Sequence, residues 1–277
     1  MIIDGKKIRD DILSEVAKGI MELPFTPVFC DILVGADPVS AQYVRMKAKT
    51  AQSVGITFRS ADFPESITTE ELISEIKHLN EVPHMCGIIV QLPLPPHINR
   101  KAILDAIEPS LDVDCLGTVA SDLFYENKNP VGFPTALACM KVLDATGVSL
   151  TDKNIVVLGR GNLVGKPVAH LLEARGLSIT TIHSQTEHPE QILKEADVII
   201  SGIGQGKFVT GDKIKQGVVV VDAGTSEDNG GVVGDVDLAS VEPVASFVSP
   251  TPGGVGPVTV AMLLRNVLQV ARTIYEH

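Results

Sequence analysis

Two series of short segments, most of them strongly apolar, alternate with stretches of helical length along this chain of 277 residues. The first series contains VFCDILVG from Val28, GITFRSADFP from Gly55 and CGIIVQLP from Cys86. The second contains NIVVLG, SITTI, DVIISG, GVVVVD and ASFVSP, beginning at Asn154. Strands that are apolar throughout are typical of parallel sheets covered on both faces, and their alternation with helices implies helical crossovers. The pattern therefore predicts an α/β protein.

The break between the two series predicts two lobes, since a chain of this length can close two modest cores. The polar stretch Ser121 to Gly132 is the best candidate for the boundary. We expect an N-terminal α/β catalytic domain over residues 1–125, completed by a C-terminal helix over 257–277 that packs back on it. A Rossmann-like dinucleotide-binding domain is expected over residues 134–256.

Three helices can be placed by their start signals in the first series. Asp37 followed by Pro38 predicts an N-cap and a helix to about Ser53, before Gly55. Thr68 and Glu71 form a capping-box pattern for a helix from Thr69. A further helix is expected from about Ile98 to Ile107.

Composition excludes several classes of protein. A formal net charge of −11 argues against binding to nucleic acid, because such proteins concentrate Lys and Arg. No apolar run reaches the roughly 18 residues of a membrane span, and the first ten residues alternate apolar and charged side chains, unlike a signal peptide. A cytoplasmic protein is expected. The four cysteines are scattered without a C-x-x-C pair, so neither a metal site nor disulfides are expected.

The segment Gly159-Arg160-Gly161-Asn162-Leu163-Val164-Gly165 lies between an apolar strand and the amphipathic stretch KPVAHLLEAR. Strand, glycine turn and helix are the layout of a dinucleotide site, where backbone N–H groups and a helix N-terminus meet the pyrophosphate. The spacing G-x-G-x-x-x-G is one residue longer than the usual fingerprint. A tight strand-to-helix turn without a cofactor is the alternative interpretation.

The second strand of this lobe ends in Thr181-Ile182-His183-Ser184, without the acidic residue that typically binds the ribose hydroxyls of NAD. With Arg160 in the glycine loop, this favours NADP, because an acidic side chain would repel the 2′-phosphate. His183 could equally cap the strand or lie in solvent.

Ser40, Tyr43 and Lys47 form one stripe on the helix that begins at Pro38. The stripe lies beside the small-residue face that packs on the sheet, so it places a phenol and an amine one turn apart at the edge of that face. An amine held there suits proton transfer. The alternative is a solvated lysine on a surface helix.

Several motifs together resemble the bifunctional methylenetetrahydrofolate dehydrogenase/cyclohydrolase family. They are the S-x-x-Y-V-x-x-K stripe from Ser40, QLPLP from Gln91, LDVDC from Leu111, the glycine loop, and SPTPGGVGPVT from Ser249. Their identity and order match from about Gly5 to Thr273, nearly the whole chain. The most specific parts are QLPLP and TPGGVGPVTVAML.

The resemblance implies a role for each matching position. Lys47 would be the catalytic lysine of the cyclohydrolase step, with Gln91 hydrogen-bonded to it and Tyr43 packed on the folate ring system. Asp114 would hold the amino-pyrimidine edge of the pterin, for which a carboxylate is suited because it accepts two N–H bonds. The resemblance also implies a homodimer.

Further contacts are expected from loops of the second lobe. The NADP-binding set comprises Gly159, Arg160, Gly161, Asn162, Val164, Gly165, His183, Ser184 and Thr225. Pro252, Gly253, Gly254 and Thr259 are expected near the substrate, although a structural turn before a helix would also explain the glycines.

The sequence departs from the family pattern beside the expected pterin site. Cys115, Leu116 and Gly117 stand where the family usually has G-F-H, and the Asn-x-Gly that commonly follows is missing from residues 120–122. The linking helix keeps only Thr135 of its usual P-C-T-P start, and Gly161 replaces a common serine.

The resemblance implies oxidation of 5,10-methylenetetrahydrofolate with NADP, followed by hydrolysis of the methenyl product to 10-formyltetrahydrofolate. Two alternatives remain at this point. One is another nicotinamide-dependent dehydrogenase, which would leave QLPLP and the Tyr43/Lys47 pair without a purpose. The other is a family member with weakened cyclohydrolase activity or with folate binding alone, because the segment after Asp114 is altered.

Overall fold

The computed structural model describes residues 1–228 and 231–276, which fold into two compact units. The first unit comprises Asp11–Pro134 and the residues from Leu263 onward, and the second comprises Met1–Asp10 and Thr135–Met262. Two long helices, α1 (Gly5–Met21) and α10 (Val255–Glu276), contribute residues to both units. The α/β fold class predicted from the sequence is confirmed.

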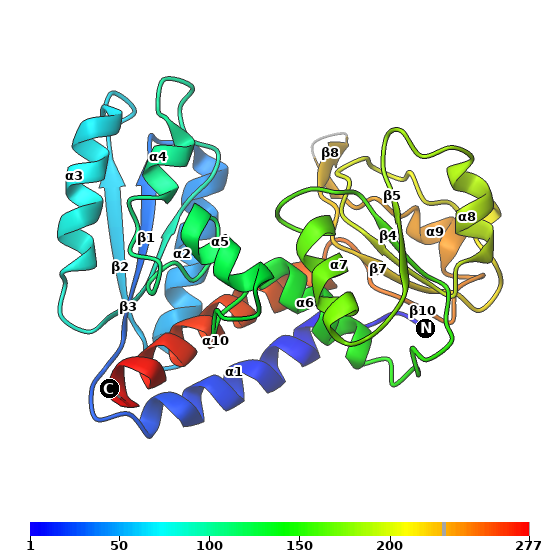
Figure 1. The fold of residues 1–277 in the computed structure, drawn as a ribbon, viewed down its shortest axis with the longest axis horizontal. Coiled ribbons are helices and arrows are strands. Elements are labelled where there is room, and N and C mark those ends of the chain that lie inside the picture. Colours follow the sequence, from blue (N-terminus) through cyan, green and yellow to red (C-terminus); the bar gives the residue numbers. More distant parts are fainter. Residues whose placement is uncertain (229–230, 277) are drawn as a thin grey trace. The chain divides into compact units, whose positions relative to one another are not determined.

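The first unit is built on a parallel sheet of three strands in the order β2-β1-β3 (Figure 1). Its strands are β1 (Val28–Val34), β2 (Thr57–Phe63) and β3 (Met85–Val90). Its remaining helices are α2 (Pro38–Ser53), α3 (Thr69–Asn80), α4 (Arg100–Leu104) and α5 (Thr118–Tyr125). The central strand β1 is buried along almost its whole length, as its apolar sequence requires.

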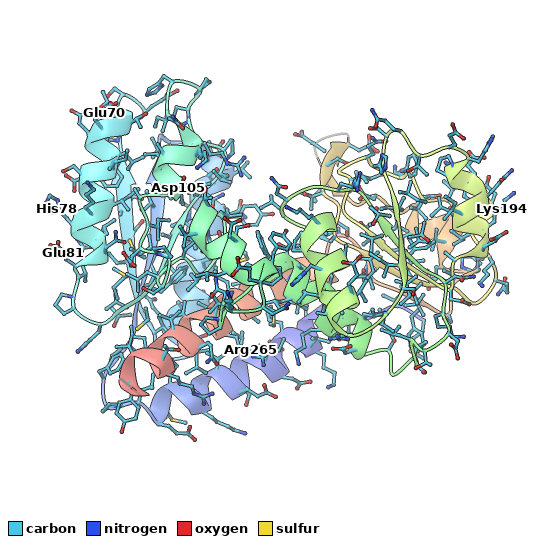
Figure 2. The ribbon with its side chains drawn as sticks, viewed as in Figure 1. Glu70, His78, Glu81, Asp105, Lys194 and Arg265 are labelled. Atoms are coloured by element: carbon cyan, nitrogen blue, oxygen red, sulfur yellow. The ribbon has the colours of Figure 1, made fainter. Side chains whose placement is uncertain are left out.

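The helix starts predicted at Asp37 and Thr68 are confirmed. Asp37 accepts a hydrogen bond from the backbone N–H of Ser40, and Pro38 occupies the first turn of α2. Thr68 and Glu71 form a complete capping box. Glu70 lies in the first turn of α3 and His78 in its last, a placement that complements the helix dipole (Figure 2).

The second unit contains a parallel sheet of five strands in the order β10-β7-β6-β4-β5. The strands are β4 (Ile155–Leu158), β5 (Ile179–Ile182), β6 (Val198–Ser201), β7 (Val219–Asp222) and β10 (Phe247–Val248). The helices are α6 (Pro134–Asp144), α7 (Gly165–Ala174), α8 (Pro189–Glu195), the short 3₁₀ helix η1 (Gly211–Lys213) and α9 (Leu238–Val241). In chain order this is the doubly wound arrangement 2-1-3-4-5, whose switch point lies between β4 and β6.

Three local features differ from the sequence-based expectations. The helix expected over 98–107 is confined to α4: Asn99 is its N-cap, and after Leu104 the chain continues in tighter turns, with the N–H groups of Ala106 and Ile107 bonded to carbonyls three residues earlier. Part of the polar segment 121–132 is helical, since α5 runs to Tyr125. The antiparallel pair β8 (Ser226–Asp228) and β9 (Gly231–Val233) was not predicted, because each strand has only three residues, too few to show a periodic pattern.

Apolar side chains are buried in both units, and the free cysteines Cys30, Cys86, Cys115 and Cys139 are among the buried residues. Within residues 1–228 and 231–276, no helix combines the length and the apolar character needed to cross a membrane.

In the second unit, the backbone of the segment before α10 lies very close to Gly5, near the start of the chain. A Cβ on Gly5 would lie 2.0 Å from the carbonyl oxygen of Gly254, and a Cβ on Gly254 would lie 2.6 Å from that of Pro250. These contacts involve backbone atoms, which cannot be displaced cheaply. The glycines of the segment before α10 therefore have a structural use.

We expect Gly5→Ala to lower the free energy of unfolding by about 2 kcal/mol or more, because of this backbone clash. Gly256→Ala is the matched control: Gly256 lies in the first turn of α10, and a Cβ added there would meet nothing within 4 Å. The control should be neutral or stabilising by up to about 1 kcal/mol. Urea unfolding of both variants tests this, and equal stabilities would contradict it.

Candidate active site

Lys47 lies in a buried polar contact between α2 and the sheet of the first unit. Its Nζ is 2.6 Å from Oδ2 of Asp31 and donates a hydrogen bond of 2.9 Å to Oε1 of Gln91. Lys47 is 8% exposed and Asp31 is fully buried, so this amine is not the solvated surface lysine of the alternative interpretation. Three elements, β1, α2 and the end of β3, bring these side chains together.

Hydrogen bonds fix both the backbone and the side chain of Gln91. Its backbone N–H continues the ladder between β1 and β3 by donating to the carbonyl oxygen of Ile32 at 2.8 Å. Its side-chain Nε2 donates to the carbonyl oxygen of Leu92 at 2.9 Å, which turns Oε1 toward Lys47. The amide can therefore accept from Lys47 without rearranging.

Asp31 is a site residue that the sequence analysis missed. It stands in the middle of the apolar strand VFCDILV, between Ser60 of β2 and Ile89 of β3 in the register. Burial raises the pKa of its carboxyl, and Lys47 opposes this effect. A single charged residue inside an apolar strand was the available signal, because an unpaired charge in such a place is costly.

Asp114 belongs to the same electrostatic environment. Burial raises the pKa of its carboxyl to about 7, Lys47 lowers it, and Asp112 and Asp31 raise it further. The side chain is partly exposed, unlike that of Asp112. The structure thus gathers one amine and three carboxyl groups in the first unit.

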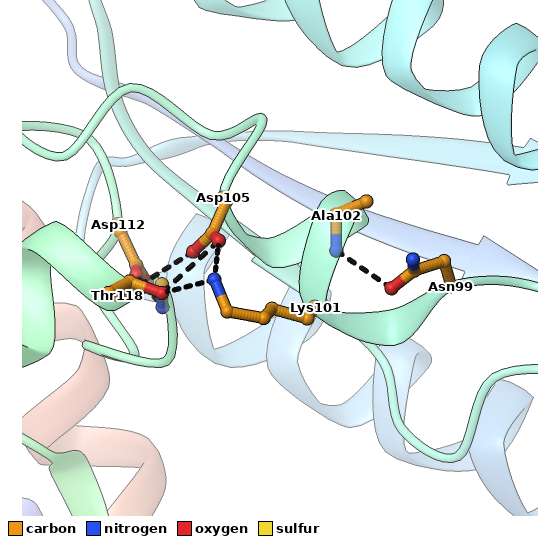
Figure 3. A network of polar contacts seen from close by, with 7 residues as sticks. Asn99, Lys101, Ala102, Asp105, Asp112 and Thr118 are labelled. Atoms are coloured by element: carbon orange, nitrogen blue, oxygen red, sulfur yellow. Dashed lines mark hydrogen bonds and ion pairs between the residues drawn. The ribbon is translucent and has the colours of Figure 1, made fainter.

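The loop that carries Asp114 is held by two other carboxylates (Figure 3). Asp112 accepts from the backbone N–H groups of Gly117 at 2.7 Å and Asp114 at 3.2 Å. Asp105 accepts from the N–H of Thr118 at 2.7 Å and contacts Lys101, which also donates to the hydroxyl of Thr118. Asp114 therefore lies on a loop that side-chain-to-backbone hydrogen bonds hold in place.

Cys115, one of the departures from the family pattern, occupies a position that favours glycine. Its φ is 57°, in the left-handed region, which costs other residues about 1–2 kcal/mol. The side chain is fully buried, and Asn129 donates to its Sγ at 3.7 Å. The substitution therefore changes the packing directly behind Asp114.

Tyr43 lies one turn before Lys47 on α2 and is 47% exposed. A half-exposed phenol ring is accessible for stacking on a flat ligand. Ser40, the third member of the stripe, is buried.

The glycine loop of the second unit follows β4 at the switch point of the sheet. Gly159 has a φ of 102°, and a Cβ on Gly165 would lie 2.1 Å from the carbonyl oxygen of Gly159. A Cβ on Gly161 would meet nothing within 4 Å. The loop therefore needs glycine at its two ends and leaves an open, exposed backbone between them.

The residues between Gly159 and Gly165 differ in their exposure. Arg160, Gly161 and Asn162 are exposed, whereas Val164 is buried. Val164 packs against Gly202, the residue after β6. The helix α7, ten residues long, begins at Gly165 and directs its N-terminus at the same edge. This cradle fits a phosphate group.

The segments after β5 and β7 reach the same edge of the sheet. His183 is partly buried; its N–H donates to the hydroxyl of Thr186 at 2.9 Å, and its Nδ1 accepts from the N–H of Gln185 at 3.3 Å. Ser184 and Thr225 are exposed. His183 is thus held by the turn that follows β5 rather than lying loose in solvent.

Two buried carboxylates, also missed by the sequence analysis, hold the loops at this edge. Asp235 accepts from the hydroxyl of Ser201 and from the N–H groups of Ile203 and Gln205 at 2.7–2.8 Å. Asp222 accepts from the N–H groups of Gly224 at 3.0 Å and Asp235 at 3.1 Å, and burial raises its pKa to about 6. They shape the loops on either side of Thr225.

Four expected substrate-contacting residues lie around the start of α10. Pro252 is exposed, and Gly253 has a φ of 108°. Gly254 is buried in the close packing described above. Thr259 is partly buried and donates to the carbonyl oxygen of Val255 at 3.2 Å.

Comparison with known proteins identifies both parts of the chain. Residues 3–114 match the catalytic domain of tetrahydrofolate dehydrogenase/cyclohydrolase, and residues 134–275 match the NAD(P)-binding domain of the same family. A relative from Nautilia profundicola, called bifunctional protein FolD, is 40% identical over 98% of this chain and 97% of its own length.

Solved structures agree with these matches. The bifunctional FolD enzyme of Campylobacter jejuni superposes with a TM-score of 0.93 at 35% identity, with 99% of each chain covered. The Trypanosoma brucei dehydrogenase-cyclohydrolase, solved with NADP and an inhibitor, has a TM-score of 0.93 at 36% identity, covering 100% of this chain and 99% of that one. Shikimate 5-dehydrogenase of Thermus thermophilus, at 14% identity and a TM-score of 0.51, shares only the fold.

The raised pKa of Asp114 predicts a pH-dependent effect on stability. The folded protein binds more protons than the unfolded chain between about pH 4 and the folded-state value of about 7. The contribution of this group to stability is therefore present below pH 4 and is lost as the pH rises through 7. Asp114→Asn, which has no such proton to lose, should gain stability relative to the parent by about 1 kcal/mol or more between pH 5 and pH 8.

Chemical unfolding of both proteins at the two pH values measures this difference. Asp122→Asn, at a position on α5, is the control and should change stability by less than about 0.5 kcal/mol. An Asp114→Asn effect that is the same at both pH values would contradict the prediction.

Proposed function

Because the chain belongs to the tetrahydrofolate dehydrogenase/cyclohydrolase family, we propose that Lys47 carries out the proton transfers of its hydrolytic step. The chain is an NADP-dependent methylenetetrahydrofolate dehydrogenase and methenyltetrahydrofolate cyclohydrolase. It oxidises 5,10-methylenetetrahydrofolate to the 5,10-methenyl form and hydrolyses that product to 10-formyltetrahydrofolate. The observation that carries the assignment to Lys47 is its buried amine, held by Gln91 and Asp31.

Hydrolysis requires one group that can both accept and return a proton. Water attacks the methenyl carbon and must lose a proton, and the ring nitrogen must gain one when its bond to that carbon breaks. Lys47 has three donor positions as an ammonium and one lone pair as an amine, so one side chain can serve both steps. Gln91, which is neutral and fixed, orients Nζ without competing for the proton.

Asp114 and Tyr43 form the folate-binding part of the proposal. As a carboxylate, Asp114 can accept two N–H bonds from the amino-pyrimidine edge of a pterin. Its partial exposure and its hydrogen-bonded loop support this role. The accessible ring of Tyr43 can stack on the ring system, while its position one turn from Lys47 keeps the reacting carbon near the amine.

We assign the cofactor to the glycine loop. NADP, when bound, accepts the hydride from the methylene carbon. Gly159, Gly161, Gly165 and the N-terminus of α7 would bind the pyrophosphate, with Val164 packing the loop from behind. Arg160, Asn162, His183, Ser184 and Thr225 surround the same sheet edge and would bind the remaining parts of the nucleotide. The absence of an acidic residue directly after β5 suits a 2′-phosphate.

We propose that Pro252, Gly253 and Thr259 contact the substrate, and that Gly254 shapes their loop. Exposure of Pro252 and partial exposure of Gly253 and Thr259 support the contact, whereas the buried packing of Gly254 supports the shaping role.

The domain boundaries, the assembly and the location also remain proposals. A folate domain over 1–125 with 257–277 and a dinucleotide domain over 134–256 are supported by the family matches and by the change of unit between Pro134 and Thr135. A homodimer in the cytoplasm is the family expectation, and symmetric pairs are the commonest assembly of soluble enzymes.

Replacing Lys47 by methionine should separate the two activities. Lys47→Met keeps the volume but removes the amine, so cyclohydrolase kcat should fall by about 10²-fold or more. Dehydrogenase kcat should stay within about threefold, because hydride transfer needs no proton from this group. The loss of methenyltetrahydrofolate absorbance and the formation of NADPH measure the two steps.

Lys49→Met is the matched control, since Lys49 is exposed on the same helix. It should leave both rates unchanged. Hydrolysis by Lys47→Met at the parent rate would remove Lys47 from the proposed role.

The glycine loop offers a paired test of the cofactor assignment. Gly165→Ala forces the loop apart, because its Cβ would lie 2.1 Å from a backbone oxygen, and NADP affinity should fall by about tenfold or more. Gly161→Ala adds a methyl group to open space and should change affinity by less than about threefold. Calorimetric titration with NADP measures both, and equal affinities would show that the cofactor binds elsewhere.

A further inference from the structure

The central strand of the first unit carries a carboxylate that its packing does not need. Asp31 is fully buried, and its six neighbours in β1 are all apolar. A buried charge is costly unless it is paired, and a buried ion pair commonly stabilises a fold no more than two apolar residues of similar volume would. The reason for an aspartate at this position therefore lies in what it contacts.

Its contact is the amine of Lys47. Oδ2 of Asp31 forms an ion pair with Nζ at 2.6 Å, and neither buried oxygen of Asp31 has a hydrogen-bond partner beyond this contact among the described residues. The carboxylate is thus directed at this one cation rather than at the backbone of a loop or a helix end. This differs from Asp112, whose oxygens accept from backbone N–H groups.

The two partners of Lys47 also determine the direction of its remaining donor. An ammonium group has three N–H bonds. Nζ donates one of them to Oε1 of Gln91 and contacts Oδ2 of Asp31 as an ion pair, which leaves a third position for a reacting group. Two fixed anchors orient Nζ far better than one, because a lysine side chain has four rotatable bonds.

We propose that Asp31 is a positioning residue for Lys47: it fixes Nζ and stabilises the ammonium formed while Lys47 holds the proton taken from water. The proposal rests on the proposed function of Lys47 in hydrolysis. Asp31 itself touches neither water nor folate in this scheme and acts through the amine.

Lys47 accepts and returns one proton during hydrolysis. As the water oxygen bonds to the methenyl carbon, one water proton moves to Nζ, and the ammonium is held by Asp31. When the bond from that carbon to the ring nitrogen breaks, Nζ returns this proton to the nitrogen. The second proton of the former water goes to solvent as the formyl C=O forms, which matches the one proton released overall.

Other charged groups surround the pair. Asp114 and Asp112 lie in the loop after α4, and Asp62 lies on the neighbouring strand β2, where it accepts from the hydroxyl of Ser60. Asp62 is exposed, and the ion pair of Lys47 is made with Asp31. Asp31 is thus the carboxylate that touches the amine directly, while the others act at longer range.

The decisive variant is Asp31→Asn, which keeps the shape and removes the charge. Cyclohydrolase kcat should fall by about tenfold or more, because the ammonium loses its anionic partner. The pH at which this kcat is half-maximal should move down by about one unit, since the amine then releases its proton more readily. Dehydrogenase kcat on the same protein should stay within about threefold.

Two further variants separate this role from a purely structural one. Asp62→Asn removes a nearby charge without touching Lys47, and should shift the pH profile by less than about 0.3 unit. Asp31→Val removes the carboxylate altogether: it should be less stable than the parent, because it leaves the buried ammonium of Lys47 without its anionic partner, and it should show the same loss of hydrolysis. An Asp31→Asn or Asp31→Val protein with the parent's kcat and pH profile would overturn the proposal.

The pairing of Asp31 with Lys47 can be tested without measuring activity, and so separately from the proposed function. The carboxyl carbon of Asp31 can be titrated by NMR in the parent and in Lys47→Met. Because Lys47 lowers the pKa of Asp31, the midpoint should rise in the variant. An unchanged midpoint would overturn the pairing. A parent that pairs these groups but does not hydrolyse methenyltetrahydrofolate would instead refute the proposed function.

Discussion

Parallel strands end at one edge of their sheet, and the candidate sites of both units depend on this constraint. In the first unit it places Gln91, at the end of β3, beside the helix that follows β1. In the second unit it brings the segments after β4, β5, β6 and β7 to a common edge. Residues far apart in the sequence thus become neighbours without any long or irregular connection.

Charge balance distinguishes the first of these sites from an ordinary buried ion pair. One amine, Lys47, pairs with Asp31 and acts electrostatically on Asp114, which Asp112 also influences, and burial raises the pKa of each of the three carboxyls. An amine paired with a buried carboxylate in this environment is suited to holding and releasing a proton, which the proposed hydrolysis of a methenyl cation requires.

Alternating apolar and helical segments were enough to predict the α/β class, and the caps at Asp37 and Thr68 were enough to place two helices. The errors lie where local signals are weak. The helix around Ile103 is shorter than expected because the chain turns away after Leu104, and the strands of the β8–β9 pair have only three residues each, too few to show a pattern. Motif order alone predicted the family, which the matches over residues 3–114 and 134–275 confirm.

The sequence by itself determined the fold class, the family, and the chemistry available at Lys47, Asp114 and the glycine loop, because these depend on residue type, order and spacing. Only the tertiary structure decided that Lys47 is buried rather than solvated, that Asp31 is its partner, and that Gly254 is needed for close packing. The physical reason is that burial and pairing depend on contacts between strands and helices distant in the chain. A carboxylate 16 positions before an amine has no meaning until a sheet and a helix bring them within 2.6 Å.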